Sequence, residues 1–441
     1  MGIFNKILRI NFATSLLFEC ARVAHFVALF LMMQKKQFGA LGILFSIVYA
    51  AIQIGSMEGG NALIPYANAF TNNKKNFIQL IRLYALPQAL LLSVSAIIAV
   101  YIGQRANLIP EDLHIASLYI FIIFEGMRAS FRHMLHAILL GRIIALVDTA
   151  SSYGYFIFVW SAILIGGYQL SLQLLWYPFV AGSVIAITIF LFSTIREYYK
   201  LPVSGTESLP SFKELTQQRA QLILLHAPKN IFSGNILVPF FGYTLGASHA
   251  ATLKIISHIA NSFRAITTSV VGFSGAALFT KASRGSANIN RAFQPLWKVV
   301  LIILLVLSVA IITTIPVIAN EWNIGIITIA FFSMAFLDYI FIIYEQMFLS
   351  QKKAYILAAI RTIEIIASYA MLIGYAKDPA IVMGGIIVFR SISFSAAVYF
   401  GYKYSNVWPS ARINSLQIMS AIGIGIMSAG IIHIVRTTFL L

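Results

Sequence analysis

Long apolar runs, separated by short polar connections, follow one another along almost the whole chain. Six of them precede a polar stretch at 196–219, and they cover residues 12–33, 40–69, 77–103, 113–140, 143–166 and 170–197. A helix of about 20 apolar residues crosses the hydrocarbon core of a bilayer. Each run is long enough for this, so the first half of the chain predicts six transmembrane helices.

The second half repeats the same number of apolar runs. They cover residues 217–245, 248–280, 294–318, 323–350, 353–376 and 379–402, and a further segment follows at 415–438. The pattern predicts an all-α integral membrane protein with an N-terminal six-helix lobe (1–199), a cytoplasmic linker (200–214), a C-terminal six-helix lobe (215–403) and an additional transmembrane helix (415–438). A faint echo between the halves, DTASSY at 148–153 and EIIASY at 364–369, indicates two homologous bundles.

The composition agrees with a membrane protein and excludes several other classes. The 441 residues are 59% hydrophobic and only 10% charged, which leaves too little polar surface for a water-soluble globule. Cys20 is the single cysteine, so the chain has no internal disulfide framework and no cysteine-based zinc or iron–sulfur site. A phosphate-binding loop of the GxxxxGK[ST] type is absent. We expect no catalytic residue, no cofactor and no bound metal.

The positive charges predict the orientation of the chain in the membrane. Twenty of the 31 Lys and Arg residues fall on the side of the N-terminus, five fall on the opposite side, and six lie within apolar runs. Lys and Arg are retained on the cytoplasmic side of a membrane. We therefore expect a multi-pass protein of the inner (plasma) membrane with a cytoplasmic N-terminus, and the net charge of +17 needs no nucleic-acid partner.

Charged residues inside the apolar runs are the main candidates for function, because a charge at mid-membrane costs about 2.5–3.5 kcal/mol on insertion scales. Three pairs lie three residues apart on one helix and could neutralise each other. They are Glu19 with Arg22, Glu125 with Arg128, and Arg361 with Glu364.

Other intramembrane cations have no acidic residue near them in the sequence, because none occurs between Glu214 and Glu321. Lys254 and His258 lie four residues apart, on one helix face. Two alternatives remain: Lys254 extends to the membrane surface, and His258 is an interior histidine satisfied by hydrogen bonds. The candidates for a substrate-binding cavity are Arg22, Glu58, Arg128, Lys229, Lys254, His258 and Arg264.

Carboxylates at membrane depth are the candidates for coupling to H⁺ or Na⁺. They are Glu58, Asp148, Asp338 and Glu345. The excess of cations inside the membrane favours an anionic substrate, such as a lipid carrying a phosphate or diphosphate, because Arg and Lys bind desolvated phosphate.

Two segments carry a resemblance to a known family. The runs QFGALGILFSIVYAAIQIGSMEGGNALIPYANAFTNNKKN (37–76) and NILVPFFGYTLGASHAATLKIISHIANSFRAITTSV (235–270) resemble the regions around helices two, seven and eight of polysaccharide flippases. These flippases belong to the multidrug/oligosaccharidyl-lipid/polysaccharide (MOP) exporter superfamily. The chain departs from their pattern at Gly234 and Asn235, where many members carry an acidic residue, and at Thr252 and Leu253, which replace a tyrosine.

The resemblance implies two six-helix lobes that form a V around a central cavity. Arg22, Glu58, Lys229 and Arg264 would then line this cavity. Members of the family flip undecaprenyl-diphosphate-linked sugars by alternating access, and relatives flip the peptidoglycan precursor or export drugs by antiport.

We therefore expect a flippase for a lipid-linked oligosaccharide or another anionic lipid, surrounded by membrane lipids, with H⁺ or Na⁺ as a coupling ion. The alternatives are a cation-coupled drug or metabolite antiporter and a membrane scaffold without transport activity. A membrane enzyme is disfavoured, because the outer connections are short and the adjacent Glu111 and Asp112 are more simply a helix cap.

Overall fold

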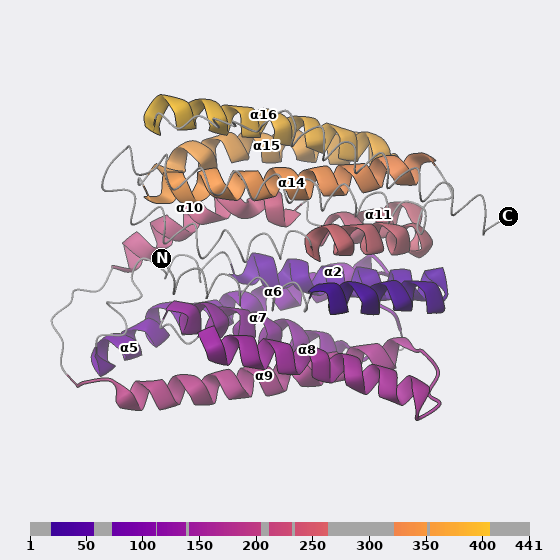
Figure 1. The fold of residues 1–441 in the computed structure, drawn as a ribbon, viewed down its shortest axis with the longest axis horizontal. Helices are drawn as coiled ribbons and strands as arrows, with labels where there is room; N and C mark the ends of the chain where they lie inside the picture. The colour runs from indigo at the N-terminus through magenta and orange to yellow at the C-terminus, as the bar shows by residue number, and fades with distance from the viewer. Residues whose placement is uncertain are drawn as a thin grey trace, which may run out of the picture. The chain divides into compact units, whose positions relative to one another are not determined.

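The computed structural model describes residues 19–56, 73–111, 113–137, 141–203, 211–231, 234–262, 322–350 and 353–405 (Figure 1). These residues are almost entirely helical, and no strand occurs among them. Contacts divide the chain into two compact units, one formed by Leu29–Ala251 and the other by Met1–Ala28 together with Thr252–Leu441. The prediction of an all-α protein is confirmed in the described ranges.

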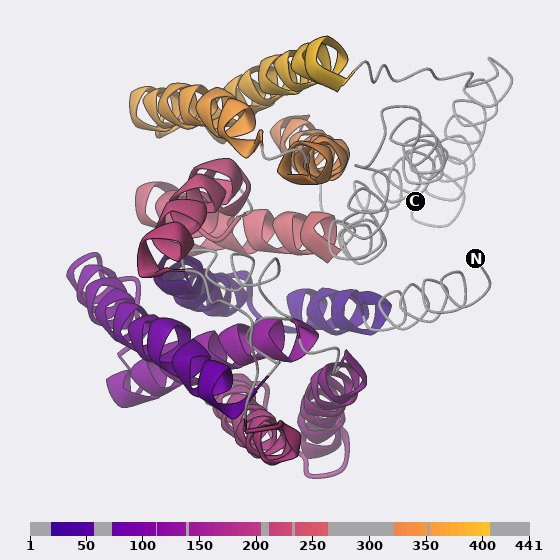
Figure 2. The same cartoon turned by 90° about the vertical axis from the view of Figure 1, so that its left-hand side faces the viewer.

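The unit Leu29–Ala251 is a bundle of helices. Its elements are α2 (Lys35–Ser56), α5 (Lys74–Leu80), the π-helical segment η2 (Ile81–Ala85), α6 (Leu86–Arg105), α7 (Ile115–Ala137), α8 (Gly141–Leu164), α9 (Leu172–Lys200), α10 (Phe212–Ile231) and α11 (Leu237–Leu245). Helix α2 packs against α6 and α7, while α9 packs against α7 and α8 (Figures 1 and 2). Helix α11 also packs against α2.

Aromatic side chains form much of the contact between α2, α7 and α9. The ring of Trp176 lies edge-on to Phe121, with centroids 5.1 Å apart, and 5.6 Å from Phe45. Trp176 is fully buried, and its indole Nε1 donates a hydrogen bond of 2.9 Å to Ser117 Oγ. The large ring is thus accommodated without leaving its polar atom unsatisfied.

Helix α10 begins with a capping box directly after the polar linker. The backbone N–H of Glu214 donates to Ser211 Oγ at 3.2 Å, and the backbone N–H of Ser211 donates to Glu214 Oε2 at 2.7 Å. The two side chains satisfy N–H groups that have no partner within the helix.

The predicted span 217–245 consists of two helices, α10 and α11, with turn residues at 234–236 between them. Gly234 has a φ of +94°, and Gly246, just beyond α11, has a φ of +93°. Glycine adopts this left-handed region without the steric penalty that a Cβ would bring. The two glycines therefore set both limits of the short helix α11.

The unit that contains the C-terminal residues is also helical. Its elements are α14 (Trp322–Ser350), α15 (Ala354–Gly374) and α16 (Pro379–Ser405), together with helical residues 19–28 and 252–262. Both α14 and α15 pack against α16. Asp378 caps α16, since its Oδ1 accepts hydrogen bonds from the backbone N–H groups of Ala380 and Ile381.

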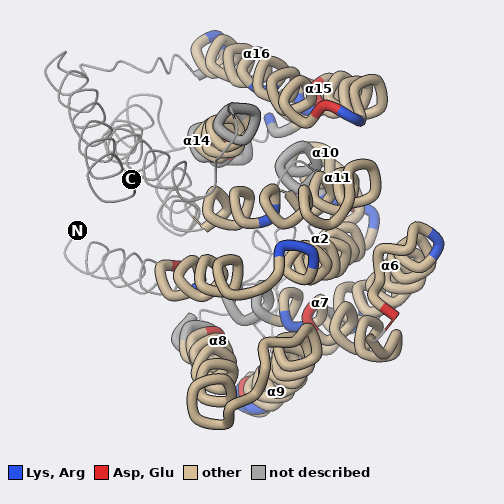
Figure 3. Tube along the Cα trace, turned by 90° about the vertical axis from the view of Figure 1, so that its right-hand side faces the viewer, with Lys and Arg blue, Asp and Glu red and all other residues tan. Residues whose placement is uncertain are grey.

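Five of the described helical stretches are long and apolar enough to cross a membrane. They are Lys35–Ser56, Lys74–Arg105, Leu172–Lys200, Tyr355–Gly374 and Pro379–Tyr404. Charged positions are sparse along the described helices (Figure 3). The predicted runs 294–318 and 415–438 lie outside the described residues, and the six-plus-six division of the chain stays a prediction.

Candidate functional site

Four basic side chains from two helices come together in the unit formed by Met1–Ala28 and Thr252–Leu441. We call Arg22, His25, Lys254 and His258 the cationic cluster. Arg22 and His25 are three residues apart on one helix, and Lys254 and His258 are four apart on the other. Helical spacing of three or four brings both members of each pair to the same face.

Direct contacts join the two helices of the cluster. The guanidinium Nη2 of Arg22 donates to Ser262 Oγ at 3.2 Å. The His258 ring also lies against Phe26, with ring centroids 4.0 Å apart. The arrangement fixes the position of Arg22 relative to His258.

The cluster is largely removed from solvent. Lys254 is only 6% exposed and His25 only 3%. This burial disagrees with the alternative in which Lys254 extends to the membrane surface. The amino group of Lys254 and the guanidinium of Arg22 lie near enough to repel each other when both are charged.

Glu19 is the single acidic residue within 19–32 and 247–262. It is buried, and its Oε2 lies 3.1 Å from Arg22 Nη2. The predicted Glu19–Arg22 pair is therefore present. Arg22 thus has a carboxylate partner on its own helix.

Some nitrogen atoms of the cluster have no protein partner. Arg22 Nε and His258 Nε2 are buried and make no hydrogen bond with any described residue. The side chain of Arg22 still keeps 30% of its surface exposed. A guanidinium that is partly paired and partly accessible can donate further hydrogen bonds to phosphate or carboxylate oxygens.

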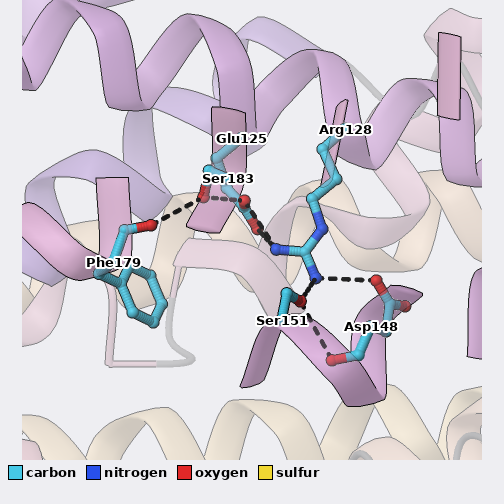
Figure 4. A network of polar contacts seen from close by, with 6 residues as sticks. All are labelled: Glu125, Arg128, Asp148, Ser151, Phe179 and Ser183. Atoms are coloured by element: carbon cyan, nitrogen blue, oxygen red, sulfur yellow. Dashed lines mark hydrogen bonds and ion pairs between the residues drawn. The ribbon is translucent and has the colours of Figure 1, made fainter. Parts of the chain in front are cut away.

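Arg128, another cavity candidate, belongs to a different group of polar residues in the unit Leu29–Ala251 (Figure 4). Its Nη1 lies 3.1 Å from Glu125 Oε2, and its Nη2 lies 2.8 Å from Asp148 Oδ1. Ser183 Oγ donates to Glu125 Oε2 at 2.6 Å. Arg128 thereby joins α7 to α8, and Glu125 joins α7 to α9. In this structure Arg128 and Asp148 are paired with each other.

The carboxylate of Asp338 lies in an ion-pair quartet formed by Asp338, Arg361, Glu364 and Arg390, from α14, α15 and α16. Arg390 Nη1 lies 3.1 Å from Asp338 Oδ1, and Arg390 Nε lies 2.8 Å from Glu364 Oε1. Arg361 Nη1 lies 2.7 Å from Glu364 Oε2. All four residues are buried, and their formal charges balance.

Four further candidates are not placed in these groups by the described contacts. Glu58 and Arg264 lie outside the described residues, and Lys229 lies on α10 in a stretch whose side chains are not described. Glu345 is buried on α14. The sequence interpretation did not single out His25 or Ser262. The spacing of His25, one turn after Arg22, was the signal that could have identified it.

Comparison with known proteins shows similarity in structure rather than in sequence. No protein-family model and no curated protein matches the chain. A multidrug resistance MATE family transporter of the MOP superfamily, in an inward-facing conformation, matches with a TM-score of 0.60 and 12% identity, covering 87% of this chain and 94% of the other.

Two further solved structures match over almost the whole chain. The lipid II flippase MurJ, in an inward closed conformation, has a TM-score of 0.54 and 13% identity over 98% of this chain and 99% of its own. A MOP-superfamily transporter from Pyrococcus furiosus has a TM-score of 0.52 and 13% identity over 92% of this chain and 95% of its own. The chain therefore has the fold of the MOP-superfamily transporters.

Proposed function

We propose that this protein is a flippase that moves an anionic, lipid-linked oligosaccharide across the inner membrane by alternating access. The observation that carries the proposal is the cationic cluster of Arg22, His25, Lys254 and His258, which has a single acidic residue on its two helices. Buried basic side chains favour a ligand that brings negative charge.

The chemistry of the cluster fits the diphosphate of a polyprenyl-linked sugar. A diphosphate has several anionic oxygens, and a guanidinium binds two of them at once through parallel hydrogen bonds. Arg22 has a buried Nε without a protein partner, and Lys254 supplies a second charge on the neighbouring helix. The substrate lipid would thus be recognised by its head group.

The fold supports transport rather than binding alone. Solved structures with this fold include MATE transporters in inward-facing and outward-facing conformations and a lipid II flippase. Two conformations of one fold, open to opposite sides, are what alternating access requires. In the proposed topology the N-terminus is cytoplasmic, and the lobes 1–199 and 215–403 rock about the linker 200–214.

A cation-coupled antiporter is the second candidate, favoured by the similarity to a multidrug resistance transporter. It would use carboxylates such as Glu58, Asp148, Asp338 or Glu345. Two of these, Asp148 and Asp338, lie 2.8 Å and 3.1 Å from arginine nitrogens. A carboxylate that already has an arginine counter-ion is a weaker ligand for H⁺ or Na⁺, which ranks this candidate second.

The test is translocation of a polyprenyl diphosphate oligosaccharide in liposomes that contain the purified protein. Arg22→Gln combined with Lys254→Met keeps the approximate size of both side chains and removes both charges. We expect at least a tenfold loss of translocation, since each 1.4 kcal/mol of lost binding is about a factor of ten.

The matched control is Lys200→Met, which removes an exposed cation paired with Glu197. The control should translocate like the native protein. If the native protein moves no such lipid but exchanges small organic cations for protons, the flippase hypothesis is wrong and the antiporter hypothesis replaces it. Full activity of the double variant would remove the cationic cluster from the mechanism.

A further inference from the structure

Glu19 holds an unusual position within the cationic cluster. Its carboxylate Oε2 lies 3.1 Å from Arg22 Nη2. The carboxylate is buried, whereas the Arg22 side chain remains 30% exposed. Glu19 therefore contacts Arg22 from the protein interior and leaves part of the guanidinium accessible.

A carboxylate and a phosphate compete for the same donors of a guanidinium, because both present paired anionic oxygens of similar geometry. Arg22 Nη2 donates its hydrogen bond to Ser262 Oγ, and Glu19 Oε2 lies 3.1 Å from the same nitrogen as an ion-pair partner. A diphosphate that binds Arg22 through two hydrogen bonds competes with Glu19 for the positive charge of the guanidinium. The Glu19–Arg22 pair is thus weakest when a head group is bound and strongest when the site is empty.

We infer that Glu19 is a built-in substitute for the head group, which neutralises Arg22 whenever the transporter carries no lipid. This inference rests on the proposed flippase function. It makes Glu19 a positioning residue that acts through Arg22. Its role in the cycle is to permit the return of the empty transporter and to speed release of the head group.

The return step explains why such a residue is needed. An empty transporter must pass through a closed state in which its cavity loses water. Desolvating the Arg22 guanidinium without an anion beside it is unfavourable, because its charge would not be compensated. The carboxylate of Glu19 compensates the charge of Arg22 in the empty transporter, and the head group does so in the loaded one. The loaded and empty proteins then face similar barriers.

Apart from Glu19, the charged or titratable groups seen to interact with Arg22 in the described ranges are the basic Lys254 and His258. His25 lies on the same helix, and Lys254 and His258 lie on the neighbouring one. None of them can take over the neutralisation of Arg22. Substitution of Glu19 should therefore affect the empty state more than the loaded state.

Glu19→Gln is the decisive variant, because it keeps the shape of the side chain and removes its charge. Three quantities should be measured: binding of inorganic diphosphate, net translocation of the diphosphate-linked lipid into lipid-free leaflets, and exchange between leaflets that both contain the lipid. Exchange requires only the loaded transporter to reorient, whereas net translocation also requires the empty return. Glu197→Gln, which removes the acid of an exposed pair with the same spacing, is the control.

We expect Glu19→Gln to bind diphosphate at least fivefold more tightly, to lose net translocation at least tenfold, and to keep exchange within about a factor of two. Unchanged binding and unchanged net translocation would overturn the role of Glu19. Equal losses of net translocation and exchange, with weaker binding, would also overturn it and indicate a structural role. Native protein that binds no diphosphate would overturn the proposed function itself, and the substitute role with it.

Discussion

The ion-pair quartet of α14, α15 and α16 makes a strong prediction for stability. Arg390 is 1% exposed and contacts both carboxylates of the quartet, Asp338 at 3.1 Å and Glu364 at 2.8 Å. Arg390→Met would leave two buried carboxylates with Arg361 as their remaining arginine partner in the quartet. Removing one partner of a buried ion pair costs about 3–5 kcal/mol. At roughly 2–4 °C per kcal/mol for a unit of this size, the melting temperature should fall by about 10 °C.

The assay is thermal unfolding of the purified protein in detergent, followed by the loss of a monodisperse peak or by tryptophan fluorescence. A double variant, Arg390→Met with Glu364→Met, restores the charge balance and leaves Arg361 to pair with Asp338. Because the uncompensated charge is gone, the double variant should unfold at a higher temperature than the single variant.

The exposed pair of Glu197 and Lys200 supplies the control. Lys200→Met should change the stability by less than about 1 kcal/mol, as is usual for surface pairs. The reasoning is refuted if Arg390→Met changes the melting temperature no more than the control does, or if the double variant is less stable than the single variant.

Two further predictions concern the unit Leu29–Ala251. Arg219 Nη2 donates to the buried Gln88 Oε1 at 3.0 Å. Arg219→Ala should therefore lower the free energy of unfolding, measured by chemical denaturation, by about 1 kcal/mol. Arg219→Lys should recover part of this loss of stability. Gly39 faces the backbone of Ala247 so closely that a Cβ would clash, so Gly39→Ala should destabilise the protein by about 1–3 kcal/mol. Gly154 has open space around it, so Gly154→Ala should stabilise helix α8 by about 0.5–1 kcal/mol. Equal melting temperatures for the two alanine variants would contradict the close contact at Gly39.

Much of the fold is predictable from apolar runs, because a membrane helix must satisfy its own backbone hydrogen bonds and is therefore long and uniform. The run 323–350 corresponds to α14 (Trp322–Ser350), and the run 379–402 corresponds to α16 (Pro379–Ser405). The π-helical segment Ile81–Ala85 was not predicted, because one extra residue in a turn leaves the apolar run unchanged.

The charged groups show where sequence interpretation ends. Pairs within one helix follow from its periodicity, and all three that were predicted are present, including Arg361 with Glu364 at 2.7 Å. Their partners on other helices were not identified. Asp338 meets Arg390, 52 positions later in the chain, only because α14 packs against α16. Such contacts depend on helix rotation and tilt, which the spacing along one helix does not specify.

The division of the span 217–245 has a consequence for how the protein enters the membrane. Helix α11 has nine residues, which at 1.5 Å per residue reach about 14 Å, half of a hydrocarbon core of about 30 Å. Among the described residues, helix α10 is not one of the stretches that are long and apolar enough to cross a membrane. Neither piece would partition independently from the translocation machinery into lipid. Their insertion must be assisted by packing against earlier helices, and both pieces contact α2. For this segment, membrane insertion and tertiary folding are one event. Insertion of the segment that follows the linker depends on α2, which is synthesised some 160 residues earlier.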